Sequence, residues 1–99
     1  MTEHYGSGTW YVKAGNEEEF VQRWTEFITW SRSTHPAMLV ASLLHDRALP
    51  GHYVSFAEWS DPSAREAWKQ TPEFAERFRA CAALCEKAKG ADYDRVVTI

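Results

Sequence analysis

Few polar side chains in this sequence have the type and spacing that catalysis or metal binding requires. Cys81 and Cys85 stand four residues apart on one expected helical face, which is half of a metal site, but no second pair of ligands follows at a suitable spacing. We therefore expect two buried thiols, no disulfide and no metal. Three histidines are nominal general bases, because imidazole ordinarily titrates near neutral pH: His35, His45 and His52. None of the three is favoured.

The aromatic side chains are more informative. The chain has 99 residues, enough for one domain, and 5 Trp, 4 Tyr and 5 Phe are among them. A domain of this size buries only about two-thirds of the surface of its unfolded chain. These rings therefore present more apolar area than one small core can hide. The surplus is expected to line a pocket, a subunit interface or both.

Charge and hydropathy exclude several classes of protein. Lys and Arg number 11 against 14 Asp and Glu, so the net charge of −3 gives no basic footprint for nucleic acid or for an anionic membrane surface. A hydrophobic fraction of 44% excludes a disordered chain. No apolar run is long enough to cross a membrane, and the first residues lack a signal-peptide core. We expect a cytoplasmic protein.

The elements that must position the rings begin after a polar segment. Residues 1–8 are expected to form a flexible tail, and residues 9–14 are rich in aromatic and β-branched types, which is typical of a strand. Asn16 is a candidate N-cap, and Glu17–Glu19 suit the positive end of a helix dipole. Apolar residues then recur at helical spacing to about Ser33.

A hairpin is predicted next. His35–Pro36 ends the first helix, because a residue before proline is disfavoured in the α region. Residues 38–46 and 52–59 are apolar and strand-like, and Leu49–Gly51 between them has the composition of a turn.

The rest of the chain is predicted to form a second helix and a last strand. Asp61–Pro62 gives a cap and a first-turn proline, and Thr71–Glu73 repeats that signal, so the helix should restart there with a kink and end at Gly90. Residues 93–99 then form the last strand. The resulting β-α-β-β-α-β order over residues 9–99 predicts an α+β, ferredoxin-like domain, with a four-stranded antiparallel sheet and two helices on one face.

One face of this sheet lacks a cover. If Trp10 and Val12 point toward the helices, alternation turns Tyr11 to the other face. Apolar residues of other strands join it there: Val54, Phe56 and Val97. Such a patch is too large for a soluble monomer. We expect a homodimer packed sheet to sheet.

Several local patterns resemble one family, the antibiotic biosynthesis monooxygenase (ABM) domain. Phe56–Trp68 resembles its strand-ending Trp, short turn and helix with a second Trp. Thr71–Phe74 is similar to its break in the second helix, Gly15–Phe20 to its opening of the first helix, and His35–Pro36 to its step into the second strand. The likeness covers residues 9–98. It implies a dimeric α+β barrel with a pocket between sheet and helices in each protomer.

The family includes haem-degrading enzymes, and this branch is disfavoured. The resemblance retains the helical Trp that helps to distort the porphyrin, here Trp68. Phe78 stands where those enzymes have the iron-ligating His, and phenylalanine cannot ligate iron. Gly8 stands near the position of their first-strand Asn.

A second branch consists of monooxygenases that act on aromatic polyketides. Its resemblance implies a catalytic pair in the pocket, with Trp59 at the end of the third strand and Ser55 at the position of an Asn. Arg65 stands in place of a helical Tyr and is a candidate for substrate binding, and a second helical Arg corresponds to Arg77 or Arg79.

The expected function is therefore a cofactor-independent monooxygenase that oxidises an anthrone-like or quinol-like aromatic with dioxygen. Five rings are expected to wall its pocket: Trp10, Trp59, Trp68, Phe74 and Phe78. The alternative is a non-catalytic dimeric ligand-binding or accessory protein on the same fold. For single residues plain packing also stays open: Trp59 and Trp68 as core, Ser55 as a structural hydroxyl and Arg65 as a solvated charge.

Overall fold

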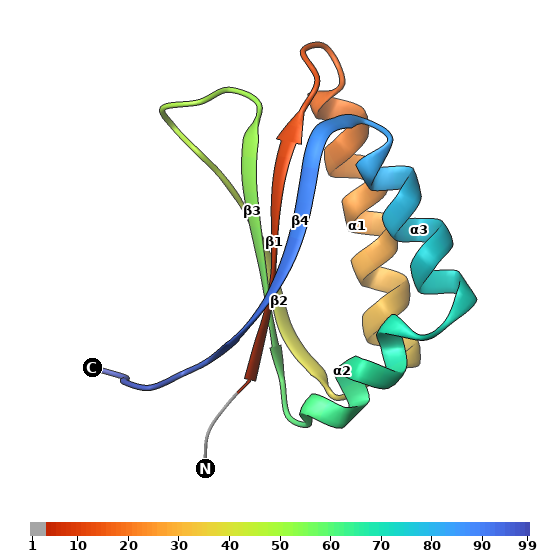
Figure 1. Ribbon diagram of the computed structural model, residues 1–99, viewed down its shortest axis with the longest axis vertical. Coiled ribbons are helices and arrows are strands. Elements are labelled where there is room, and N and C mark those ends of the chain that lie inside the picture. The colour runs from red at the N-terminus through yellow and green to blue at the C-terminus, as the bar shows by residue number, and fades with distance from the viewer. Residues whose placement is uncertain (1–3) are drawn as a thin grey trace.

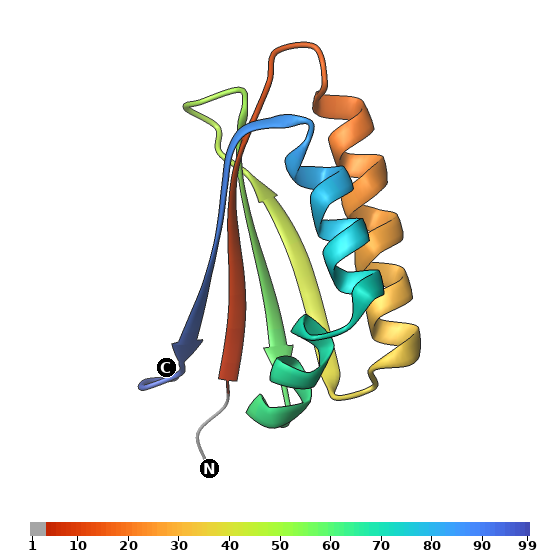
Figure 2. The ribbon, with the colours of Figure 1, turned by 45° about the vertical axis from the view of Figure 1, so that its right-hand side comes forward.

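The structure is a computed structural model that describes residues 4–99. It is one four-stranded antiparallel sheet with three helices on one of its faces (Figures 1 and 2). The strands follow the spatial order β2-β3-β1-β4: β1 His4–Val12, β2 Met38–His45, β3 His52–Trp59 and β4 Cys85–Asp94. The helices are α1 Glu17–Thr34, α2 Pro62–Lys69 and α3 Pro72–Ala82. The predicted ferredoxin-like fold is confirmed.

Helix α1 forms for the reasons that the sequence indicates. Three glutamates occupy its first turn, where the partial positive charge of the helix dipole stabilises them. Its buried stripe packs on the sheet at helical spacing and consists of Phe20, Trp24, Phe27 and Ser31. Asn16 precedes the helix, but its side chain makes no capping hydrogen bond.

The predicted kink in the second helix is a break into two helices. The Asp61 side chain accepts a hydrogen bond from the Ser63 backbone N–H at 2.9 Å and caps α2. The Thr71 hydroxyl accepts one from the Phe74 N–H at 3.1 Å and caps α3. Each cap is followed by a proline in the first turn, where the missing N–H costs nothing.

The predicted tail was placed wrongly. β1 begins at His4, so residues 4–8 belong to a strand, whereas residues 1–3 lie outside the described part of the chain. His4 pairs with Trp59 on one side and with Asp94 on the other. Backbone pairing on both sides holds this polar, glycine-rich segment in the sheet, although Tyr5 is its only residue with a strong preference for strands.

The last strand was also placed wrongly. α3 ends at Ala82 and β4 covers Cys85–Asp94, so neither a helix to Gly90 nor a strand over 93–99 exists, and Val97 lies beyond the sheet. Charged residues that favour a helix alternate in β4 with small residues that face the helices, which is tolerated because β4 is an edge strand.

The two cysteines do not share a helical face. Cys81 ends the buried side of α3 and Cys85 begins β4; both thiols are free and buried. Burial raises the pKa of Cys81 to about 12, so this thiol stays protonated. Within residues 4–99 no three His, Cys, Asp or Glu side chains are placed to hold a metal ion.

The two faces of the sheet differ as predicted. Trp10 and Val12 are buried under the helices, whereas Tyr11 and Phe56 lie on the bare face. Further exposed apolar residues extend that face: Val40, Leu44 and Tyr93. None of the helices in the described chain combines the length and apolar character that a bilayer crossing needs.

Candidate functional site

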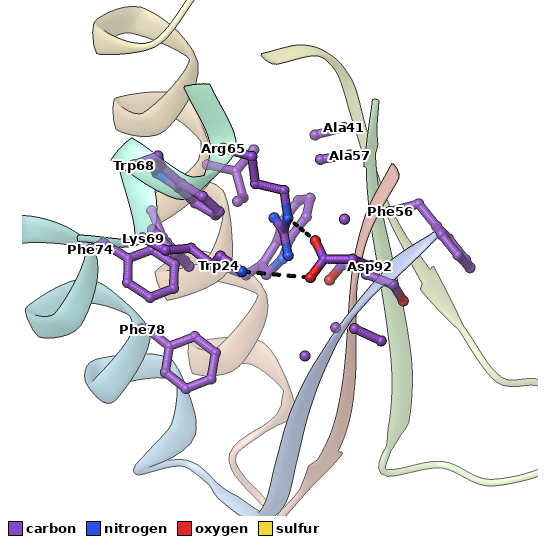
Figure 3. Close-up of a pocket in the computed structure, with 18 of the residues that line it drawn as sticks. Trp24, Ala41, Phe56, Ala57, Arg65, Trp68, Lys69, Phe74, Phe78 and Asp92 are labelled. Atoms are coloured by element: carbon purple, nitrogen blue, oxygen red, sulfur yellow. Dashed lines mark hydrogen bonds and ion pairs between the residues drawn. The ribbon is translucent and has the colours of Figure 1, made fainter. Parts of the chain in front are cut away.

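A cavity of about 270 Å³ lies between the sheet and the helices. This volume is close to the lower end for small-molecule sites, about 300 Å³. Most of its aromatic wall comes from the three helices and from β1: Trp10, Trp24, Phe27, Trp68, Phe74 and Phe78. Phe56 of β3 also borders the cavity, but its ring points away from the helical rings (Figure 3). Such walls bind flat, apolar ligands.

The rings hold one another in place. Phe74 and Phe78 are stacked with their centroids 5.6 Å apart, and Phe78 lies 5.3 Å from Trp10. The Trp68 ring is held by α1, because its indole N–H donates to the buried Ser31 hydroxyl at 2.9 Å. The walls are therefore ordered before a ligand arrives.

Two glycines of β1 make room for the polar groups of the cavity. A Cβ on Gly6 would collide with the Arg65 guanidinium, and a Cβ on Gly8 would stand 2.7 Å from both the Ser55 Oγ and the Trp10 Nε1. The polar, glycine-rich start of β1, which resembled a tail, is thus the floor of the site.

Ser55 has a defined role as a donor. The Trp10 indole N–H donates to the Ser55 Oγ at 3.1 Å. Because this hydroxyl already accepts a hydrogen bond, its own O–H is available to donate, and Ser55 lines the cavity. The arrangement offers a hydrogen bond to an oxygen atom of a ligand.

Charged groups close one end of the cavity. Arg65 of α2 is buried and its Nε donates to Asp92 Oδ1 of β4 at 2.5 Å, while Lys69 Nζ lies 3.5 Å from Asp92 Oδ2 (Figure 3). His4 lies 3.2 Å from Asp92 Oδ1. Burial opposes the ionisation of Asp92, but the hydrogen bond and charge of Arg65, aided by His4 and Lys69, lower its pKa to about 2.

The structure brings six of the seven predicted site residues to this cavity: Trp10, Ser55, Arg65, Trp68, Phe74 and Phe78. Trp59 is the exception. It is only 1% exposed, packs 5.2 Å from Trp68 and does not line the cavity, and its indole N–H has no partner among the described residues. Its position is that of a core residue behind the wall.

Sequence reasoning predicted Arg65 at the charged end but missed its partners Asp92 and Lys69. Asp92 was missed because β4 was misplaced. With the correct strand, the alternation of Ala88, Gly90 and Asp92 on one face would have indicated it. Lys69 was missed because a helical lysine resembles any solvated charge. Trp24 and Phe27, which belong to the buried stripe of α1, are wall residues as well.

The three histidines lie elsewhere. His52 Nδ1 pairs with Asp46 Oδ2 at 2.8 Å, and this hydrogen bond lowers the pKa of Asp46. His45 Nε2 contacts the Pro50 carbonyl at 2.7 Å, and His35 contacts the neighbouring threonine. None of them lines the cavity.

The sequence profile of one family, described as antibiotic biosynthesis monooxygenase (ABM), matches residues 7–80. The chain belongs to the ABM family. The match includes most of β1, α1, the hairpin, α2 and most of α3, and hence all of the cavity lining except Gly6 and the residues of β4. Membership supports a monooxygenase-type function at the level of the family. No curated protein sequence matches the chain.

Solved structures with the ABM fold superpose closely. The chain is similar to SnoaB, a cofactor-independent oxygenase from Streptomyces nogalater, with a TM-score of 0.88 and 21% identity over 100% of this chain and 98% of that one. It is also similar to a protein from Methanosarcina mazei Go1, with a TM-score of 0.82 and 16% identity over 94% and 92%. At these identities the likeness establishes the fold.

Proposed function

We propose that this protein is a cofactor-independent monooxygenase that oxidises an electron-rich aromatic, such as an anthrone or a quinol, with dioxygen in the cavity. The observation that carries the proposal is an ordered aromatic slot in which the Trp10 indole holds the Ser55 hydroxyl as a donor.

The reaction needs no electrons from outside the substrate. An anthrone-type CH₂ loses a proton, and the carbanion passes one electron to dioxygen. The substrate radical and superoxide then combine to form a C–O bond, and the resulting hydroperoxide loses water. The net change converts R₂CH₂ and O₂ into R₂C=O and H₂O, so one oxygen atom enters the substrate and the other leaves as water.

The residues contribute binding, charge stabilisation and exclusion of water. The aromatic walls orient a flat ring and keep bulk water from the radical pair. The Ser55 O–H is placed to donate to the substrate oxygen on which negative charge develops, and Arg65 adds a cation at the other end. The substrate anion is stabilised before dioxygen reacts.

A non-catalytic ligand binder is the second candidate, and one observation favours it. The histidines lie outside the lining. If the protein is an enzyme, its substrate must be acidic enough to ionise with the help of Ser55 and Arg65.

Oxygen consumption by metal-free protein separates the two candidates. With anthrone and 1,4-dihydroxynaphthalene, consumption should exceed the protein-free background, and Ser55→Ala should lower kcat at least about tenfold because it removes the donor. Ser42→Ala, on the other face of the sheet, is the matched control and should retain the rate. Tight ligand binding without oxygen consumption would favour the binder instead.

The bare face of the sheet supports a further part of the proposal, a homodimer packed sheet to sheet. Aromatic and aliphatic side chains of all four strands are exposed there: Val40, Leu44, Phe56, Tyr11 and Tyr93. Covering such a patch with a second copy removes apolar area from water at about 25 cal/mol per Å².

A further inference from the structure

The charged end of the cavity has a feature that oxygen chemistry does not require. Arg65 is 7% exposed, and only its Nε makes a hydrogen bond. Within residues 4–99 no hydrogen bond or ion pair runs from its Nη atoms, and Nη1 lies where a Cβ on Gly6 would stand. These Nη donors keep contact with solvent, since they are not among the fully buried polar atoms that lack a partner, so a ligand that displaces this water must supply an acceptor. A ligand in the cavity is the natural acceptor.

The lining charges do not cancel. Among the lining residues that the structure describes, Arg65 and Lys69 are cationic and Asp92 is the one anion, so this lining carries one uncompensated positive charge. Glu66 and Asp94 also contact members of this group, but their side chains are 60% and 65% exposed, and water screens them. The surplus charge faces an apolar cavity, where electrostatic attraction is stronger than in water.

The cationic side chains at the charged end already bind one carboxylate, that of Asp92. The Asp92 carboxylate receives the Arg65 Nε at 2.5 Å and lies near Lys69 and His4. A guanidinium is a planar fork that fits carboxylates in particular, and its remaining Nη edge can hold a second one.

The strand geometry sets the spacing between the two polar positions. Arg65 lies over Gly6 and Ser55 over Gly8, two residues apart on one face of β1. Strands rise about 3.3 Å per residue, so these positions are about 7 Å apart. An aromatic ring between the walls spans this distance.

We propose that the Nη edge of Arg65 binds a carboxylate carried by the aromatic substrate, while Ser55 binds an oxygen at the opposite side of the ring. This inference rests on the proposed function, since it takes the cavity as the substrate site. It narrows the substrate class to aromatic acids. Asp92 holds the guanidinium in place and, as an anion, limits the affinity for the ligand.

Two non-oxidisable probes of nearly equal shape test this assignment: 2-naphthoate, which is ionised at neutral pH, and 2-naphthamide, which is neutral. Isothermal titration calorimetry should show that the wild-type protein prefers naphthoate at least about tenfold, because a hydrogen bond to a charged group is worth more than a neutral one. Equal affinities, or no binding of either probe, would overturn the proposal.

Variants assign the preference to Arg65. Arg65→Met should abolish it, and Gly6→Ala should weaken it by displacing the guanidinium while leaving the ion-pairing residues intact. Asp92→Asn should increase naphthoate affinity severalfold, because it removes the competing anion. The matched control, Arg77→Met, removes the same charge from a guanidinium that lies over Trp30 outside the cavity, and it should retain the preference.

Arg65→Met and Asp92→Asn are expected to change naphthoate affinity in opposite directions, and this difference separates ligand recognition from a purely structural ion pair. If the Arg65–Asp92 contact only fastens α2 to β4, Arg65→Met and Asp92→Asn should weaken binding together, and that result would overturn the proposal. If Arg65→Met fails to fold, the naphthoate affinities of Gly6→Ala and Asp92→Asn test the proposal in its place. A preference for naphthoate without oxygen consumption would refute the monooxygenase function and retain the carboxylate site. Turnover of neutral aromatics without that preference would retain the monooxygenase function and refute the carboxylate site.

Discussion

The two faces of the sheet carry similar aromatic side chains in different surroundings. Toward the helices, Trp10 and Trp68 are buried and each indole N–H has a serine acceptor. On the bare face, Tyr11 and Phe56 lie more than a third exposed, and no helix covers them. On one face these two indoles are paired and the rings pack around a cavity, whereas the other face exposes apolar area that nothing in the described chain covers. The contrast shows how strand alternation divides the aromatic surplus between a ligand site and a candidate interface.

The largest effect is expected on the bare face. Phe56→Asp should convert the proposed dimer into a monomer, because it places a charge at the centre of the apolar patch where a partner sheet would desolvate it. Light scattering measures the mass. The stability of the protomer should change little, since Phe56 is 38% exposed.

Val21→Asp is the matched control for this variant. Val21 lies on α1 and is 40% exposed, so the substitution has the same chemistry and nearly the same exposure on a surface outside the patch. It should leave the mass unchanged. An undiminished mass for Phe56→Asp would show that the bare face is not the interface.

At Trp59, in the core behind the cavity wall, the expected effect is on protomer stability. Trp59→Ala should lower the free energy of unfolding by about 3–5 kcal/mol, because it deletes a fully buried indole and leaves a void behind Trp68. Denaturant unfolding measures the change. Phe78→Ala, at a ring that borders the existing cavity, should cost less because the deleted volume joins that space.

The milder variant Trp59→Phe tests the catalytic role that the family resemblance implied. With the indole outside the lining, kcat/KM should stay within about a factor of two of wild type. A stable Trp59→Phe protein that has lost turnover would restore Trp59 to the catalytic machinery.

The fold and the aromatic walls were predictable because their signals are local. Proline after a capping residue marks the starts of α2 and α3, and alternation in the strands assigns Trp10 and Tyr11 to opposite faces. The wall residues Phe74 and Phe78 follow from helical spacing on α3.

Arg65 was predicted from a family position, but the rest of the charged end was not predictable, because its signals are tertiary. Residues 4–8 become a strand through pairing with β3 and β4, and Lys- and Glu-rich β4 overrides a helical preference because it completes the sheet edge. Asp92 meets Arg65 only once β4 is in register beside β1. Ser55 was predicted from a family position, but its role as a donor depends on the Trp10 indole, a contact between two strands.

The smallest predicted effect lies on the inner face of the edge strand β4, at Asp92. The folded-state pKa of Asp92 lies near 2, below the ordinary value of 3.8, so its ionised form stabilises the folded protein above about pH 4. That contribution is lost as the pH falls from about 4 to 2, where the folded-state carboxyl takes up its proton. Because the side chain is 41% exposed, solvent screening leaves about 1 kcal/mol.

The pH dependence of unfolding isolates this contribution. Asp92→Asn should have a shallower loss of stability between pH 4 and 2 than wild type, with the two curves converging at the acid end, as measured by denaturant midpoints. Asp61→Asn is the comparison, since the pKa of Asp61 is also lowered, by hydrogen bonds from Ser63, but its side chain lies outside the cavity lining. It should flatten the same curve without altering naphthoate affinity. If Asp92→Asn leaves the acid slope unchanged, the Arg65–Asp92 contact does not stabilise the folded state, and the inner face holds its charged end by packing alone.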